Sequence, residues 1–122
     1  MPFAAFIGAQ LVSASPEEVR GRLEWAAERC TTGGIMHGGA LMALADSVGA
    51  YCTVLNLPAG AGTATIESKT NFFRAVREGF VEAVSTPLHV GRTTIVIQTD
   101  LLDDKGRRVA RVTQTQAVIP AS

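Results

Sequence analysis

The sequence predicts an α+β domain in which an antiparallel sheet curls around one long helix. One observation is a nearly continuous apolar stretch from Gly38 to about Leu57, which is typical of a helix buried inside a protein. A second is the period-two alternation of apolar and polar residues in the segments around that stretch, which is typical of half-buried antiparallel strands. Because loops alone cannot bury a helix, the sheet must wrap it.

Composition supports a single globular domain over residues 1–122. The chain is 47% hydrophobic and 18% charged, and its eleven basic residues balance its eleven acidic ones. A net charge of zero gives no electrostatic reason to expect nucleic acid or an anionic membrane as a partner. The first residues, MPFAAFIGAQ, lack the basic region of a secretory signal, so we expect a cytoplasmic protein.

The N-terminal third predicts a short helical turn within residues 3–11 and a two-stranded hairpin. The strand at 17–25, EEVRGRLEW, places Val19, Leu23 and Trp25 on one face and its charged residues on the other. Its partner is expected at 7–13, with the turn at Ser15-Pro16.

The long helix follows a loop, TTGGIMHGG, and is predicted to end at Pro58-Ala59-Gly60. Leu41, Leu44, Val48 and Leu55 recur at helical spacing. The stretch is long enough to cross a bilayer, but Asp46 lies near its centre and β-structure is predicted on both sides. These features favour a core helix over a membrane span.

The remainder of the chain predicts four antiparallel strands, near residues 63–75, 79–89, 92–103 and 107–119. Turns are expected at Gly79, at Gly91 and over residues 103–106. The two cysteines, Cys30 and Cys52, fit no metal motif and are expected to be reduced thiols.

Asp46 is the candidate catalytic carboxylate. No Lys or Arg occurs between residues 30 and 68, so the helix offers it no basic partner. One interpretation is that Asp46 faces solvent or caps another element. The other is that it lines a pocket and acts as a base or nucleophile, because an unpaired buried carboxylate is costly.

The second candidate feature is the helix start at His37-Gly38-Gly39, which has no Ser, Thr, Asp or Asn as N-cap. Free amides there could bind a developing oxyanion, although His37 could instead form a local cap. Gly38 and Asp46 are eight residues apart, or about 12 Å along a helix. If both serve one reaction, they come from two copies of the chain, which predicts a homodimer.

Three segments carry a family resemblance: GGIMHGGALMALAD, KTNFFRAVREG and HVGRTT, in that order. Over residues 3–119 the chain resembles the hotdog-fold acyl-CoA thioesterases, especially the 4-hydroxybenzoyl-CoA and phenylacetate-pathway types. The resemblance implies a helix wrapped by an antiparallel sheet, a dimer that often forms a tetramer, and hydrolysis of an acyl-CoA thioester.

The resemblance also implies roles for individual residues. Asp46 would be nucleophile or general base, and the Gly38 amide of the facing subunit would polarise the thioester carbonyl. Thr31 stands where many relatives have Asn or Gln. The implied catalytic set is Asp46, Gly38, His37 and Thr31, and the implied substrate or CoA-binding set is Gly39, Asn71, Arg74, Gly91, Arg92 and Thr93. No metal or cofactor is implied.

The sequence leaves two alternative functions open. A module that binds acyl-CoA without turnover gains weight from Thr31, whose hydroxyl reaches less far than an amide. An acyl dehydratase would need His37 to work with an acid across the dimer. The acyl group is left open between aryl, phenylacetyl-like and medium-chain groups, with Val48, Tyr51, Ile66 and Phe72 as candidate lining residues.

Overall fold

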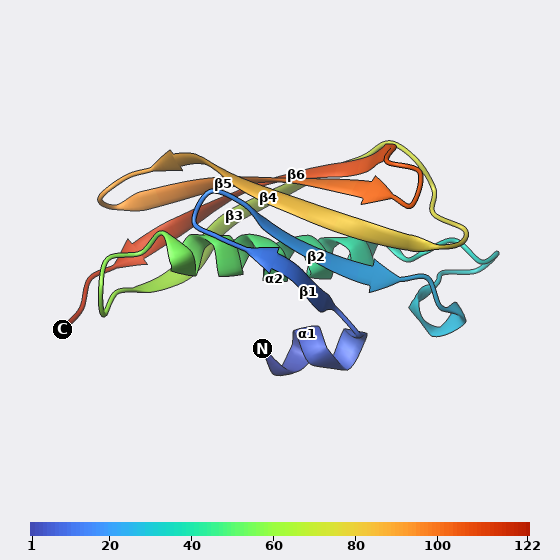
Figure 1. Cartoon of the computed structure of the whole chain (residues 1–122), viewed down its shortest axis with the longest axis horizontal. Coiled ribbons are helices and arrows are strands. Elements are labelled where there is room, and N and C mark those ends of the chain that lie inside the picture. Colours follow the sequence, from blue (N-terminus) through green and yellow to red (C-terminus); the bar gives the residue numbers. More distant parts are fainter.

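A computed structural model describes all 122 residues and confirms the predicted fold class. A six-stranded antiparallel sheet, in the order β1-β2-β4-β5-β6-β3, curls around the long helix α2 (Figure 1). The elements in chain order are α1 (Pro2–Ile7), β1 (Gln10–Ala14), β2 (Val19–Glu24), the 3-10 turn η1 (Ala27–Arg29), α2 (Gly38–Leu55), β3 (Gly62–Phe72), β4 (Phe80–Val90), β5 (Thr94–Asp103) and β6 (Arg108–Ile119).

The two faces of the sheet follow the alternation in the sequence. On β2, Val19 and Leu23 are fully buried against α2. Arg20 and Arg22 alternate with these buried positions and face outward, where both guanidinium groups bind the Glu82 carboxylate of β4 at 3.0 Å. The concave face therefore forms the core, and the convex face is polar.

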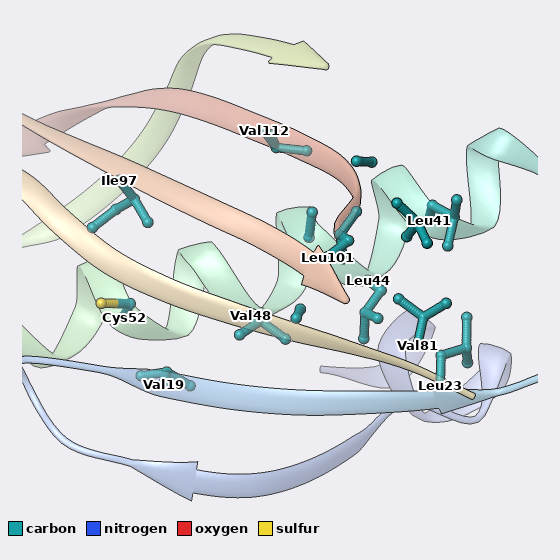
Figure 2. Packing of buried hydrophobic residues seen from close by; sticks show 14 of the residues in the cluster. Val19, Leu23, Leu41, Leu44, Val48, Cys52, Val81, Ile97, Leu101 and Val112 are labelled. Carbon is teal, nitrogen blue, oxygen red and sulfur yellow. The ribbon is translucent and has the colours of Figure 1, made fainter. Parts of the chain in front are cut away.

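Helix α2 buries one side against the concave face of the sheet. Leu41, Leu44, Val48 and Cys52 point from this side toward strand residues such as Leu101 (Figure 2). By length and composition alone α2 could cross a membrane. In the fold it occupies the place of a core helix.

Several predicted boundaries differ from the structure. The first strand, expected over 7–13, spans Gln10–Ala14, because Ile7 belongs to α1 and Gly8 ends that helix. The strand expected over 63–75 ends at Phe72, because the next two amides both donate to the Val109 carbonyl and the chain then leaves the sheet. Farther along, the Val76 carbonyl accepts the Met36 amide, which draws this segment over the start of α2. Helix α2 ends at Leu55 because the Asn56 side-chain amide donates to the carbonyls of Cys52 and Pro16.

The sheet leaves β3 as a bare edge beside α2. Nine of its eleven residues are exposed, and Ile66, at a shift in the pairing register with β6, is 62% exposed. Large apolar side chains of α2, β3 and the segment that follows remain uncovered on this side, namely Met42, Val54, Ile66, Phe72 and Phe73. This open side of the helix positions the candidate site.

Candidate functional site

A hollow of about 380 Å³ opens at the start of α2. Thr31 and Gly38 lie on one wall, and Phe72, Phe73 and Arg74 lie on the other. The backbone N–H of Gly38 has no hydrogen-bond acceptor in the chain, as expected for the first amide of a helix. A free amide donor with the positive end of the helix dipole behind it therefore faces this hollow.

The second amide of the helix is already occupied. The Nδ1 atom of His37 accepts the Gly39 N–H at 2.8 Å, so His37 is the N-cap of α2. The structure thus shows the local cap that the sequence left open. The free N–H donor at the start of α2 is therefore that of Gly38, whereas the Gly39 N–H is already hydrogen-bonded to His37.

The loop before α2 is held in place by backbone hydrogen bonds. Gly33 and Gly34 have φ values of 84° and 75°, a left-handed conformation that favours glycine. This turn lets the Thr31 amide donate to the Ile35 carbonyl at 2.8 Å, and the His37 amide donates to the Arg29 carbonyl at 2.8 Å. The position of the Gly38 amide is therefore fixed by the surrounding backbone.

Gly38 lies close to the Phe72 side chain. A Cβ atom at this position would lie 3.2 Å from Cζ of Phe72, closer than ordinary van der Waals contact. Phe72 is the last residue of β3 and faces α2 across the hollow. The tip of the Phe72 ring therefore narrows the hollow beside the Gly38 backbone.

Asp46 is exposed, so within one chain it faces solvent, as the first of the two interpretations has it, and its carboxylate is not buried. It forms no hydrogen bond or ion pair with any other residue of the chain. The reason is its position on the outer side of α2, one turn after the exposed Met42. Asp46 is thus an unpaired carboxylate next to an uncovered apolar side chain, Met42.

The structure brings some of the other candidate residues to this hollow. Arg74, just beyond β3, lines it together with Thr31 and Gly38. Asn71 does not reach it, because Asn71 pairs in register with Arg111, whose side chain binds Asp100 on the convex face of the sheet.

Gly91, Arg92 and Thr93 form the turn between β4 and β5, at the opposite end of the sheet from Gly38. The Thr93 carbonyl accepts the Val118 amide at 2.9 Å, and Val118 pairs with Thr63 near the start of β3. Gly38 instead lies at the other end of β3, beside Phe72. Within one chain, Arg74 and Arg92 are thus held at opposite ends of the sheet.

The two thiols are free, as expected. Burial raises the pKa of the Cys52 thiol to about 11, which keeps it protonated near neutral pH and unsuited to nucleophilic attack. The carboxylate of Asp46 is the only acidic group on α2.

Sequence reasoning did not assign Phe73, Ile35 or Met36 to the hollow, although all three line it. The pair Phe72-Phe73 at the end of a predicted strand could have indicated Phe73. Adjacent residues of a strand face opposite ways, so both rings can reach one site only where the strand ends between them.

The short helix α1 was expected, but its contact with the outer side of α2 was not.

Comparisons with known proteins agree with this geometry. Residues 33–110 match the family model described as the thioesterase superfamily. The 1,4-dihydroxy-2-naphthoyl-CoA hydrolase of Escherichia coli is 35% identical over 86 residues, which are 70% of this chain and 63% of that protein. The chain thus spans less than two thirds of the length of that relative.

Solved structures show the same fold over nearly the whole chain. A Mycobacterium tuberculosis protein, provisionally named as an esterase, superposes with a TM-score of 0.95 at 25% identity, covering 100% of this chain and 99% of that one. The phenylacetic acid degradation protein of Thermus thermophilus, solved as a variant, gives a TM-score of 0.88 at 27% identity, covering 96% of this chain and 98% of that one.

Proposed function

The chain belongs to the thioesterase superfamily, and from this premise we propose that it hydrolyses an acyl-CoA thioester to a carboxylic acid and CoA. The observation that carries the proposal is the pairing of a free amide donor, Gly38, with an unpaired carboxylate, Asp46, on one helix. These are the two groups that acyl transfer requires, one for the developing oxyanion and one for the attacking oxygen.

The chemistry follows from the two groups. The Gly38 N–H donates to the thioester carbonyl oxygen and stabilises the negative charge that forms there. Asp46 either attacks the carbonyl carbon directly, which gives a mixed anhydride that water then hydrolyses, or removes a proton from an attacking water. In both routes the C–S bond breaks, the CoA thiolate leaves, and the thiolate is finally protonated.

The spacing of the two groups supports a site shared between two copies of the chain. Eight residues on α2 correspond to about 12 Å, too far for one carbonyl group to contact both. A two-fold axis beside the residue midway between them would bring Gly38 of each copy to Asp46 of the other. That midway residue is Met42, an apolar side chain left 41% exposed in the single chain.

The bare β3 edge supports the same arrangement. Two β3 strands that pair antiparallel about a two-fold axis place the start of one beside the end of the other. The turn of Gly91, Arg92 and Thr93 lies at the start of β3, so the second copy would bring this turn to Gly38 and Arg74. Arg74 and Arg92 would then approach one another and could bind the phosphates of CoA.

Thr31 would assist in the same hollow. Its side chain lines the wall that also carries the free Gly38 amide. A hydroxyl donates one hydrogen bond, so Thr31 could hold the attacking water or the carbonyl where relatives use an amide.

Thiol release from acyl-CoA substrates tests this proposal. We expect the wild-type chain to release CoA, and Asp46→Asn to reduce kcat by about 100-fold or more without a change of fold. Glu17→Gln is the matched control, because Glu17 is exposed at the β1–β2 turn, forms no ion pair and lies outside the site. Equal activity of wild type and Asp46→Asn would remove Asp46 from the mechanism, and tight binding without turnover would favour an acyl-CoA-binding module.

A further inference from the structure

Trp25, the only tryptophan of the chain, contacts the loop that leads into α2. Its indole Nε1–H donates to the Gly34 carbonyl at 3.0 Å, and Cζ2 of the ring lies 3.9 Å from where a Cβ atom of Gly34 would stand. The ring does not itself line the hollow at the start of α2. Any influence of Trp25 on a reaction in that hollow must therefore pass through the loop.

The tip of this loop has little else to hold it. Thr32, Gly33 and Gly34 form one hydrogen bond among them, the one that the Gly34 carbonyl accepts from Trp25. Thr32 and Gly33 are exposed, and Gly33 and Gly34 both have left-handed φ values. Because glycine restrains the backbone less than other residues do, a tip with two glycines depends on a contact with another segment for its order.

This tip belongs to the turn that carries Thr31. The Thr31 amide donates to the Ile35 carbonyl across the tip at 2.8 Å, and Thr31, Ile35 and Met36 all line the hollow. Gly34 directly precedes Ile35, so a displacement of Gly34 also moves the acceptor of the Thr31 amide. The indole N–H of Trp25 thus ties the tip of this wall of the hollow to the end of the sheet.

Trp25 is itself fixed in the fold. It directly follows β2, and its backbone amide donates to the Gly79 carbonyl at 2.8 Å. Its half-buried ring packs against the hydrophobic core. An anchored backbone and a packed ring make the indole N–H a rigid support for the Gly34 carbonyl.

Resting on the proposed thioesterase function, we infer that Trp25 is a positioning residue for Thr31. The indole N–H holds the turn of residues 31–35 against the hollow, and this turn presents the Thr31 hydroxyl to the thioester carbonyl or to the attacking water. A hydroxyl that is already oriented stabilises the transition state more than one on a mobile loop. The effect falls on kcat rather than on CoA binding, since the proposed CoA contacts, Arg74 and Arg92, belong to other segments.

Two substitutions test the coupling between Trp25 and Thr31. Trp25→Phe keeps an aromatic ring but removes the N–H donor, and Thr31→Val keeps the branched shape but removes the hydroxyl. With benzoyl-CoA and hexanoyl-CoA, we expect Trp25→Phe to lower kcat about 5-fold, the size of one neutral hydrogen bond, while KM changes less than about 2-fold. In the Thr31→Val chain, Trp25→Phe should change kcat less than about 2-fold, because the group that Trp25 positions is gone. Losses that multiply in the double variant, or an unchanged kcat in Trp25→Phe, would overturn the inference.

Phe80→Leu is the matched control. Phe80 begins β4, pairs with Glu24 at the end of β2, and lies under the Arg22 guanidinium on the convex face, with Cζ of Arg22 3.8 Å from the ring centroid. The control therefore alters an aromatic residue near Trp25 on the face of the sheet away from the loop. It should leave kcat unchanged, and a loss equal to that of Trp25→Phe would replace positioning by a general loss of packing.

Hydrogen exchange separates this inference from the proposed function, because it requires no turnover. In Trp25→Phe the Thr31 amide should exchange about 5-fold faster or more. The Phe73 amide, which donates to the Val109 carbonyl on the other wall of the hollow, should exchange at the wild-type rate.

The two measurements together assign any failure. If wild type releases no thiol but the Thr31 amide exchanges faster in Trp25→Phe, Trp25 positions the turn and the proposed catalysis is wrong. If wild type is active and the Thr31 amide exchanges equally fast in both chains, Trp25 does not hold the turn and the inference is wrong.

Discussion

The Nδ1 atom of His37 accepts the Gly39 N–H at 2.8 Å, and this bond leaves the adjacent Gly38 N–H as the free donor at the start of α2. His37 is therefore a positioning residue for the proposed oxyanion donor. The bond both caps the helix and fixes the orientation of its first turn.

His37→Ala should remove the cap. We expect the free energy of unfolding, measured with urea, to fall by about 1 kcal/mol, and kcat to fall while KM changes less. His37→Asn should recover most of both losses, because its side-chain oxygen is also a good N-cap acceptor. An alanine variant with unchanged kcat would show that the cap does not influence the donor.

A mixture of two inactive variants should test the shared site. Gly38→Val should obstruct the donor, because its branched side chain would stand beside the amide at the hollow, where even a Cβ would lie 3.2 Å from Cζ of Phe72. In a heterodimer of Gly38→Val and Asp46→Asn chains, one site has both groups intact and the other has neither. Coexpression in equal amounts should therefore restore about a quarter of wild-type activity, because about half of random dimers are mixed and each has one working site.

The control for this mixture is each variant expressed alone, which should remain inactive. A mixture that is no more active than its components would place Gly38 and Asp46 in separate reactions or in one chain.

Gly49 provides a prediction about stability. A Cβ atom there would overlap the buried side-chain amide of Gln114, which β6 directs at α2. Helix propensity alone would favour alanine over glycine by about 1 kcal/mol, whereas overpacking costs about 1–3 kcal/mol. We expect Gly49→Ala to lower the urea midpoint, and Gln114→Ser in the same chain to reverse the sign of the alanine effect.

Asp103 should make stability depend on pH. Its side chain is 6% exposed, and burial alone would raise the pKa of the carboxyl group, but hydrogen bonds from the Arg107 amide and guanidinium and from the Lys105 amide outweigh burial and lower it. A lowered pKa in the folded state stabilises the fold above the unfolded-state pKa and loses this effect as pH falls through the folded-state value.

Asp103→Asn should therefore destabilise the chain at pH 7, and the gap between wild type and variant should close in urea titrations carried out at progressively lower pH below about 4. A gap that stays constant down to acidic pH would mean that the Asp103 charge contributes nothing.

The fold could be predicted because its elements depend on local periodicity. Alternation around Val19 and Leu23 gave the buried face of β2, and the apolar run after Gly38 gave α2. The end of β3 at Phe72 could not be predicted, since it depends on the Val109 carbonyl accepting two amides from the departing chain, a contact between distant segments.

The sequence predicted which residues belong to the candidate site, but not which of their side chains are exposed. The spacing of Gly38 and Asp46 could be read directly, and so could the absence of a basic partner. A helix that is apolar all round does not reveal which side the sheet leaves bare, so the sequence could not show that Asp46 is exposed. Nor could it show that His37 caps Gly39, because this depends on the orientation of the imidazole ring.

The bare edge of β3 has a kinetic consequence. If only a second copy completes the site, each catalytic unit forms by a bimolecular encounter, and the fraction of assembled enzyme follows mass action. On dilution below the dissociation constant of the pair, activity per milligram should decline, and the total rate should approach the square of protein concentration. The specific activity of the protein would then depend on its own concentration.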